Sequence, residues 1–292
     1  MRIVLLAALV AWAGQAYDPF AEARRAEVNG TTLAYVERGT GGTPVVFVHG
    51  SGADLRTWGY QLQHFSQSRR TLVYSRRFHH PNPPPTPSDT YTPGQHAADL
   101  AAMIGTLAGG RADVVASSYG AVIALLTARD HGARIGRLVV VEPVIFSMLP
   151  ATSAGASAPA AFERARAQLL AGEAEASMRT FLAALLAPGA YDMMPETTRA
   201  MLRDNLPELT AEARAPLPGT SPRYTCEDAR AVRVPTLLLD GAQSAVFLRD
   251  ITRELASCLP GVERGTITGA AHALHAQQVQ AFNGAVTAFL DR

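Results

Sequence analysis

Hydrophobic positions along the chain alternate between two kinds of spacing. Short runs rich in Val, Leu and Ile are typical of strands buried on both faces, and they are followed by longer segments whose apolar residues recur every three or four positions, as in amphipathic helices. The predicted strands are 44–50, 71–75, 112–118, 137–144, 235–240 and 263–268, and the predicted helices are 55–65, 95–107, 119–130, 245–259 and 277–290. This alternation predicts a mostly parallel sheet with helices on both faces.

The first part of the sheet is predicted to be antiparallel. Residues 26–38 alternate in polarity around Asn29-Gly30, a dipeptide typical of tight hairpin turns. Two antiparallel strands are therefore expected to precede the parallel ones. The fold class is α/β, with a central sheet of about eight strands.

Two stretches interrupt the alternation. Residues 79–93 contain Pro83-Pro84-Pro85 and are expected to form a loop, because proline lacks the N–H group that a helix or an inner strand needs. Residues 146–229 have no strand pattern and show Ala-rich helical patterns instead. We predict an α/β core formed by residues 17–145 and 230–292, with residues 146–229 inserted as a helical cap.

The N-terminal residues have the pattern of a cleaved signal peptide. An apolar run from Ile3 to Ala13 follows Arg2, and it is shorter than the roughly 20 apolar residues that span a bilayer. We interpret residues 1–16 as a signal peptide, which predicts an exported or periplasmic protein. The alternatives are an apolar N-terminal helix or a wrongly chosen start codon, and either would leave the protein in the cytoplasm.

The two cysteines bear on the question of export. Cys226 precedes the predicted strand 235–240 and Cys258 ends the helix after it, so both are expected at the same end of the sheet. The sequence leaves open a disulfide between them or two buried free thiols.

The charge composition of the chain excludes some classes of binding partner. Charged residues make up 17% of the chain and the net charge is +1, so the sequence lacks the basic surface of a nucleic-acid binder or a polybasic membrane-surface protein. No Cys/His group has zinc-site spacing, and no cofactor or metal is expected. A small-molecule substrate is the expected partner, and the sequence does not predict the oligomeric state.

The candidate nucleophile is Ser118. In Val114-Val115-Ala116-Ser117-Ser118-Tyr119-Gly120-Ala121 a strand pattern changes abruptly into a helix pattern at this serine. A serine on so tight a turn stands clear of the sheet, and the positions two before and two after it must be small, as Ala116 and Gly120 are. The alternative is an incidental serine in a strand–turn–helix unit.

A serine nucleophile needs a base and an oxyanion hole. His272 lies in the turn after the last predicted strand, where it would face the serine, and is the candidate base. The backbone N–H groups of Tyr119 and Ser51 are the candidate oxyanion donors. Gly50 permits a close approach to the substrate, and Trp58 either lines the pocket or belongs to the core.

These motifs resemble the α/β-hydrolase family in their order along nearly the whole chain. They are the His49-Gly50 loop, the turn around Ser118 and the Gly269-to-His272 turn. One position departs from the family pattern, because Ser244 stands where members usually carry the catalytic Asp. A hydroxyl cannot supply the anion that steadies an imidazolium.

The catalytic acid is therefore expected elsewhere. Glu142 ends the strand after the nucleophile turn, in an otherwise apolar run, and a carboxylate buried there is costly without a partner. Certain haloalkane dehalogenases of this family carry their acid after that strand. We choose Glu142, with Asp240, Asp250 or no acid as alternatives.

The resemblance implies a serine hydrolase of the carboxylesterase type, which acts on a small, mostly uncharged ester through an acyl-enzyme. Carbon–carbon bond hydrolysis, a lyase reaction and cofactor-free oxygenation also occur on similar scaffolds. A ligand-binding receptor without turnover is a further alternative. Arg76-Arg77 and His79-His80 could bind a carboxylate or phosphate, but a solvated loop is the favoured interpretation.

Overall fold

An eight-stranded sheet forms the centre of the protein, in the order β1-β2-β4-β3-β5-β6-β7-β8. The computed structural model describes residues 19–215 and 222–292, so the predicted signal peptide at 1–16 lies outside the described residues. The strands are β1 (Arg24–Val28), β2 (Thr31–Arg38), β3 (Val45–Val48), β4 (Thr71–Tyr74), β5 (Ala112–Ser117), β6 (Ile135–Val141), β7 (Thr236–Gly241) and β8 (Glu263–Ile267).

The sheet is mostly parallel. Strands β3 to β8 pair in parallel, whereas β1 and β2 form an antiparallel hairpin and β2 joins β4 in antiparallel register. Asn29 and Gly30 take positive φ angles of 49° and 72° at the hairpin turn, a conformation that these two residue types adopt at low cost. The predicted α/β fold with about eight strands is confirmed.

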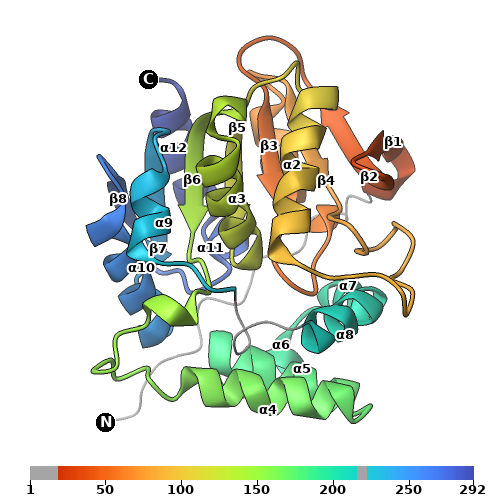
Figure 1. Ribbon diagram of the computed structural model, residues 1–292, viewed down its shortest axis with the longest axis vertical. Helices are drawn as coiled ribbons and strands as arrows, with labels where there is room; N and C mark the ends of the chain where they lie inside the picture. Colours follow the sequence, from red (N-terminus) through yellow and green to blue (C-terminus); the bar gives the residue numbers. More distant parts are fainter. Residues whose placement is uncertain (1–18, 216–221) are drawn as a thin grey trace.

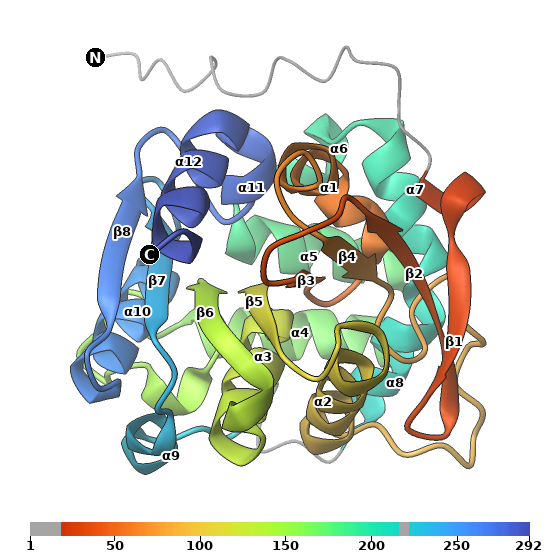
Figure 2. The ribbon, with the colours of Figure 1, turned by 90° about the horizontal axis from the view of Figure 1, so that it is seen from above.

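Helices cover both faces of the sheet (Figure 2). The α-helices are α1 (Gly59–Phe65), α2 (Pro93–Leu107), α3 (Tyr119–Asp130), α4 (Ala158–Leu170), α5 (Ala174–Leu185), α6 (Ala190–Met193), α7 (Glu196–Asp204), α8 (Leu206–Arg214), α9 (Cys226–Ala231), α10 (Val246–Cys258), α11 (Leu274–Gln277) and α12 (Val279–Leu290). Short 3₁₀ helices are η1 (Pro19–Glu22), η2 (Leu55–Trp58), η3 (Gly132–Arg134) and η4 (Phe146–Met148).

Successive side chains along each strand point to opposite faces of the sheet, so the sheet divides the hydrophobic core into two halves. In β3, Val46 and Val48 pack with α2, α3 and α10 on one face, whereas Val45 and Phe47 pack with α1 and α12 on the other. All four side chains are fully buried. A strand covered on both faces must be apolar at every position, which explains the continuous hydrophobic runs.

Five helices, α4 to α8, lie between β6 and β7 in the chain, and we refer to them as the inserted helices. Figure 1 shows them gathered beyond the carboxyl ends of the parallel strands. Asn205, between α7 and α8, donates to Asp54 Oδ2 at 2.8 Å and accepts from the His80 N–H at 2.9 Å. These contacts tie the inserted helices to the loops that follow β3 and β4.

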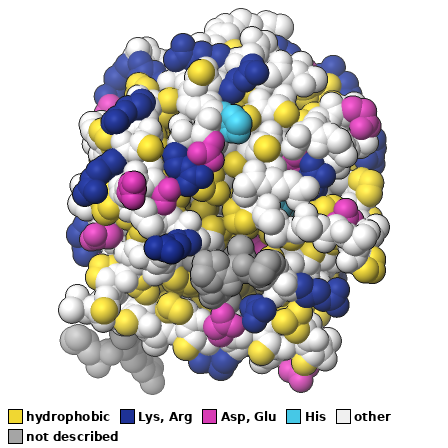
Figure 3. Space-filling view, viewed as in Figure 1, with side chains coloured by type: hydrophobic (Ala, Val, Ile, Leu, Met, Phe, Trp, Pro, Cys, Tyr) yellow, Lys and Arg dark blue, Asp and Glu magenta, His cyan; other side chains and the backbone are white. Residues whose placement is uncertain are grey.

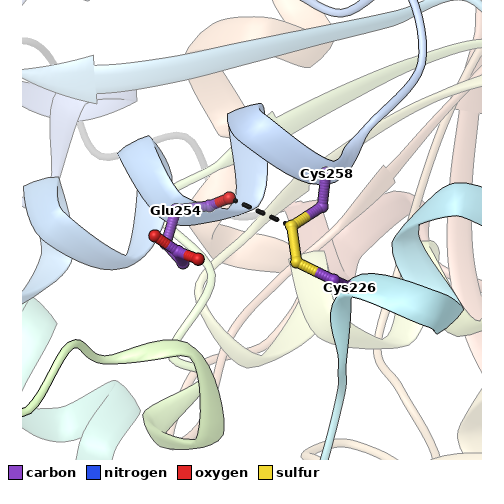
Figure 4. A group of neighbouring side chains, drawn as sticks. All are labelled: Cys226, Glu254 and Cys258. Carbon is purple, nitrogen blue, oxygen red and sulfur yellow. Dashed lines mark hydrogen bonds between the residues drawn. A yellow bond between two sulfur atoms is a disulfide. The ribbon is translucent and has the colours of Figure 1, made fainter.

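A disulfide joins α9 to α10 (Figure 4). Cys226 and Cys258 are bonded, with their Cα atoms 5.1 Å apart, and Cys258 Sγ lies 3.4 Å from the Glu254 carbonyl. The structure thus contains the first of the two alternatives that the sequence left open. Sulfurs bonded in this way are not thiolates, so this group is not a thiolate metal site.

Charges of both signs are mixed on the face shown in Figure 3, around hydrophobic side chains near its middle. This mixture agrees with the net charge of +1. Among the described residues, no helix is both long and apolar enough to cross a membrane.

Candidate active site

Ser118 occupies a strained turn between β5 and α3. Its φ and ψ are 58° and −125°, a region that side-chain-bearing residues rarely adopt, and its N–H donates to Val141 O at 2.9 Å. A Cβ at Gly120 would lie 2.3 Å from the His49 carbonyl oxygen, which is too close for any side chain. The predicted requirement for a small residue two positions after Ser118 therefore has a direct steric cause.

Glu142 and His272 meet at the carboxyl ends of β6 and β8. Glu142 directly follows β6 with a positive φ of 41°, and its side chain is fully buried. His272 Nδ1 donates to Glu142 Oε2 at 2.8 Å, and the N–H of Gly241 donates to Glu142 Oε1 at 2.8 Å. With Nδ1 as donor, the lone pair of the imidazole lies on Nε2.

The alternative acids are not joined to this histidine in the part of the chain that the structure describes. Asp240 is buried in β7 and makes no hydrogen bond to His272, and the Asp250 carboxylate accepts from Ser153 and Arg253. Ser244, at the position of the usual family acid, is buried as well. The structure thus brings only Glu142 of these candidates to His272.

Ser118 and His272 share no direct hydrogen bond within residues 19–215 and 222–292. The hydrogen bonds of catalytic groups are often long in an unliganded enzyme and shorten when substrate binds. The His272 side chain is 12% exposed, so one side of the ring remains accessible.

The loop after β3 lies against Ser118. A Cβ at Gly50 would lie 2.9 Å from Ser118 Cβ and 3.3 Å from its Oγ. Tyr119 begins α3, where the first backbone N–H groups have no partner within the helix. The N–H groups of Ser51 and Tyr119 therefore belong to the two segments that border the nucleophile.

Arg76 fixes the orientation of the peptide that carries the Ser51 N–H. Its Nη2 donates to Gly50 O at 3.1 Å and its Nε to His49 O at 3.1 Å, while His49 Nδ1 donates to Gly50 O at 2.9 Å. In a planar trans peptide the C=O and the following N–H point in opposite directions. Because two donors hold the Gly50 carbonyl, the N–H of Ser51 is held on the other side.

The expectation that Arg76 and Arg77 lie in a solvated loop is wrong. Arg76 is 1% exposed and Arg77 is 8% exposed. Carbonyl oxygens accept from Arg76, and Asp99 pairs with Arg77 through two bonds of 2.7 Å. A buried guanidinium is tolerated when its donors are satisfied in this way, and neither position has a sequence pattern that announces those partners.

Three buried histidines surround Arg76, and their environment favours the neutral ring. Burial, followed by the charge of Arg76 and of neighbouring rings, lowers the pKa of His49, His79 and His96 well below the usual value. The hydrogen bonds agree, since His49 Nε2 accepts from the N–H of Arg76 at 2.9 Å. Arg76 is therefore the cation of this cluster.

Two glutamates of α8, the fully buried Glu208 and the partly exposed Glu212, complete the cluster, and sequence reasoning missed both. Glu208 Oε1 accepts from the Tyr91 hydroxyl at 2.6 Å and lies 3.0 Å from His79 Nε2. Glu212 accepts from the Ser51 hydroxyl at 3.0 Å and from Tyr91 at 3.3 Å. Two acids one turn apart destabilise an exposed helix, so this spacing was the available indication of a special environment.

The environment of these two acids favours their neutral forms. His79 Nδ1 donates to the Ala53 carbonyl at 2.7 Å, and its Nε2 lies 3.0 Å from Glu208 Oε1 without forming a hydrogen bond. Burial raises the pKa of Glu208, and burial together with Glu208 raises the pKa of Glu212 to about 8.

A mainly apolar cavity lies between the inserted helices and the loop after β3. Its lining residues are Ser51, Phe162, Ala165, Arg166, Leu169, Ser177, Met178, Phe181, Leu182, Leu202, Leu209, Glu212, Ala213 and Ala215. The cavity thus reaches the segment that borders Ser118.

Trp58 does not line this cavity. It is fully buried in the core, with ring centroids 5.1 Å from Phe47 and 4.6 Å from His275. The prediction that it binds substrate is corrected to the alternative, a core role, because η2 turns its indole toward the sheet and α11.

Comparison with known proteins agrees with the observed fold. The enol-lactonase from Burkholderia xenovorans LB400 superimposes with a TM-score of 0.75 at 21% identity, over 92% of this chain and 100% of that one. An N-acyl homoserine lactone degrading enzyme superimposes with a TM-score of 0.74 at 23% identity, over 91% of this chain and 100% of that one. A thermophilic esterase from Thermogutta terrifontis superimposes with a TM-score of 0.70 at 22% identity, over 92% of this chain and 98% of that one. The model of the alpha/beta hydrolase family matches residues 45–285, and the chain belongs to this family.

Proposed function

We propose that the protein is a serine hydrolase that cleaves small, mostly uncharged esters through an acyl-enzyme. The observation that carries the proposal is the 2.8 Å hydrogen bond between His272 Nδ1 and Glu142 Oε2, at the end of the sheet where Ser118 stands on its strained turn. A base that is oriented by a buried carboxylate, at the same end of the sheet as a serine on a tight turn, is the arrangement that activates a hydroxyl.

The reaction follows from these positions. Ser118 Oγ bonds to the ester carbonyl carbon while its proton passes to His272 Nε2, giving a tetrahedral oxyanion. The carbon–oxygen bond to the leaving alcohol then breaks, and the alcohol takes that proton. Water repeats the sequence on the acyl-enzyme, releasing the acid and restoring Ser118, while Glu142 holds the ring and stabilises the imidazolium.

The proposed oxyanion donors are the N–H groups of Ser51 and Tyr119. Both donors are backbone groups rather than mobile side chains, so little reorganisation is needed when charge develops. Arg76 acts as a positioning residue, because it holds the Gly50 carbonyl and thereby aims the N–H of Ser51. These residues perform the reaction without a cofactor or metal.

An uncharged substrate is supported by the cavity, whose lining is mainly aliphatic and aromatic. The inserted helices act as a cap over this cavity. A lactone is an internal ester, and relatives of this fold include an enol-lactonase and an N-acyl homoserine lactone degrading enzyme. Lactones therefore belong in the panel of substrates to be tested.

Export of the protein is supported by the disulfide, since such bonds persist in oxidising compartments.

Labelling with a fluorophosphonate tests the proposal, because this probe reacts only with an activated serine. We expect labelling of the wild type, loss of labelling in Ser118→Ala, and retention in Ser117→Ala, the matched neighbour in the same turn. Loss of ester turnover should accompany loss of labelling. A folded wild type that neither labels nor cleaves esters would favour the receptor or a non-hydrolytic reaction.

A further inference from the structure

Among the described residues that line the cavity between the inserted helices and the Ser51 loop, Glu212 is the polar side chain that contacts this loop from the inserted helices. Of its polar lining residues, Ser177 donates to Ala165 O at 2.7 Å, and Arg166 donates to Ala213 O at 2.6 Å with a side chain 37% exposed. Their hydrogen bonds lie within the inserted helices. Glu212 remains, together with Ser51, which binds it.

Glu212 has three polar neighbours in the protein, Ser51, Tyr91 and Glu208. The Ser51 hydroxyl donates to its Oε1 at 3.0 Å. The contact of its Oε2 with the Tyr91 hydroxyl is long, 3.3 Å, because that hydroxyl is committed to Glu208 at 2.6 Å. Part of the Glu212 surface stays accessible, in keeping with its place on the cavity wall.

The environment of this carboxyl favours its neutral form. Burial and the neighbouring Glu208 raise the pKa of Glu212 to about 8, so near neutral pH it carries a proton. A neutral carboxyl both donates and accepts hydrogen bonds, and it offers no charge that would select a cation. The matching ligand group is an uncharged one that can also donate and accept, namely a hydroxyl.

We propose that Glu212 is a specificity-determining residue that binds a hydroxyl on the acyl chain of the substrate, within about two carbons of the ester carbonyl. The position follows from Ser51, whose backbone N–H is aimed at the carbonyl oxygen while its side chain bonds Glu212. The inference rests on the proposed function, because that function places the carbonyl. The favoured substrates are thus hydroxyacyl esters.

Paired esters test this preference. We expect the wild type to show a kcat/KM for p-nitrophenyl 3-hydroxybutyrate about tenfold above that for p-nitrophenyl butyrate, mainly through KM, as one good hydrogen bond provides. Glu212→Leu should remove the preference and Glu212→Gln should keep most of it. Glu175→Gln, which alters an exposed acid on α5, is the matched control and should behave as wild type. Equal kcat/KM values for both esters in the wild type would overturn the inference without any variant.

Measurements of ligand affinity test the role of Glu212 independently of whether Ser118 is the nucleophile. Calorimetric titration of Ser118→Ala should show tighter binding of ethyl 3-hydroxybutyrate than of ethyl butyrate, and the double variant Ser118→Ala/Glu212→Leu should lose the difference. Equal affinities in Ser118→Ala would overturn the Glu212 assignment even if Ser118 is labelled. A difference that depends on Glu212 would sustain the site even if Ser118 is not labelled.

Discussion

Glu142 and His272, 130 residues apart in the sequence, are joined by a hydrogen bond of 2.8 Å between Oε2 and Nδ1. Glu142 has a second fixed contact, since its Oε1 accepts from the N–H of Gly241. The carboxylate is therefore held from two sides in a fully buried position. Its orientation dictates the tautomer of the imidazole.

Replacement of Glu142 by Gln should reduce kcat by about 10³- to 10⁴-fold with little change in KM. An amide can present its NH₂ group to Nδ1, which moves the ring proton to Nε2 and removes the base. Steady-state kinetics on a p-nitrophenyl ester measure the effect. Asp240→Asn, the control for the other buried acid, should stay near wild type, and the reverse ranking would move the acid to Asp240.

Adding a methyl group at Gly50 should impair the nucleophile without unfolding the chain. The new Cβ would lie 2.9 Å from Ser118 Cβ, so either the loop or the nucleophile must shift. We expect Gly50→Ala to lower kcat/KM about 10²-fold, as small misplacements of reacting groups do. Gly94→Ala is the matched control, because nothing lies within 4 Å of its added Cβ. Wild-type kinetics in Gly50→Ala would contradict the proposed position of the loop.

Arg76→Lys should weaken the oxyanion hole while keeping the positive charge. A lysine ammonium cannot reproduce the guanidinium fork that reaches both the His49 and the Gly50 carbonyl. The expected result is a fall in kcat of up to about 10²-fold with KM nearly unchanged, the mark of a lost transition-state contact. Arg24→Lys, in an exposed ion pair, provides the control. An increase in KM alone would assign Arg76 to substrate binding.

Removal of the disulfide should affect stability rather than catalysis. Cys226 and Cys258 are 32 residues apart, and closing such a loop stabilises a fold by roughly 3 to 4 kcal/mol in the chain-entropy model. The double variant Cys226→Ala/Cys258→Ala should lose about this much free energy of unfolding in urea titrations, with unchanged KM. Reduction of the wild type should give the same loss, and equal midpoints before and after reduction would contradict the prediction.

The Glu208–Glu212 pair should make stability depend on pH. The pKa of Glu212 is raised from 4.5 to about 8 in the fold, so its contribution is fully present below pH 4.5 and is lost as pH rises through 8. The groups that face the pair are Arg76, His79 and Tyr91, with the Ser51 hydroxyl.

The free energy of unfolding should therefore fall between about pH 5 and 9 more steeply in the wild type than in Glu212→Gln, which cannot ionise. Urea titrations at several pH values measure both curves. Parallel curves would show that Glu212 is ionised throughout this range.

Local patterns predicted most of the fold because strand and helix periodicities depend on near neighbours. The run around Ser118 shows a tight turn through its small residues, and the Asn29-Gly30 dipeptide shows a hairpin. Glu142 could be chosen because a lone acid at the end of an apolar strand is costly unless it has a partner.

The Arg76 cluster could not be predicted in this way. Its members come from the loops after β3 and β4, from Tyr91 and from α8, and each has an ordinary polar neighbourhood in the sequence. Whether such groups are solvated or buried depends on how the inserted helices pack against the sheet.

The sequence by itself therefore determined the order of strands and helices, the nucleophile turn and the family to which the chain is similar, since these depend on short-range periodicity and sterics. Only the tertiary structure decided that Arg76 is a buried cation, that Trp58 belongs to the core, and that Glu208 and Glu212 share one environment. Burial and charge coupling act between residues distant in the chain, and they appear only when the chain is folded.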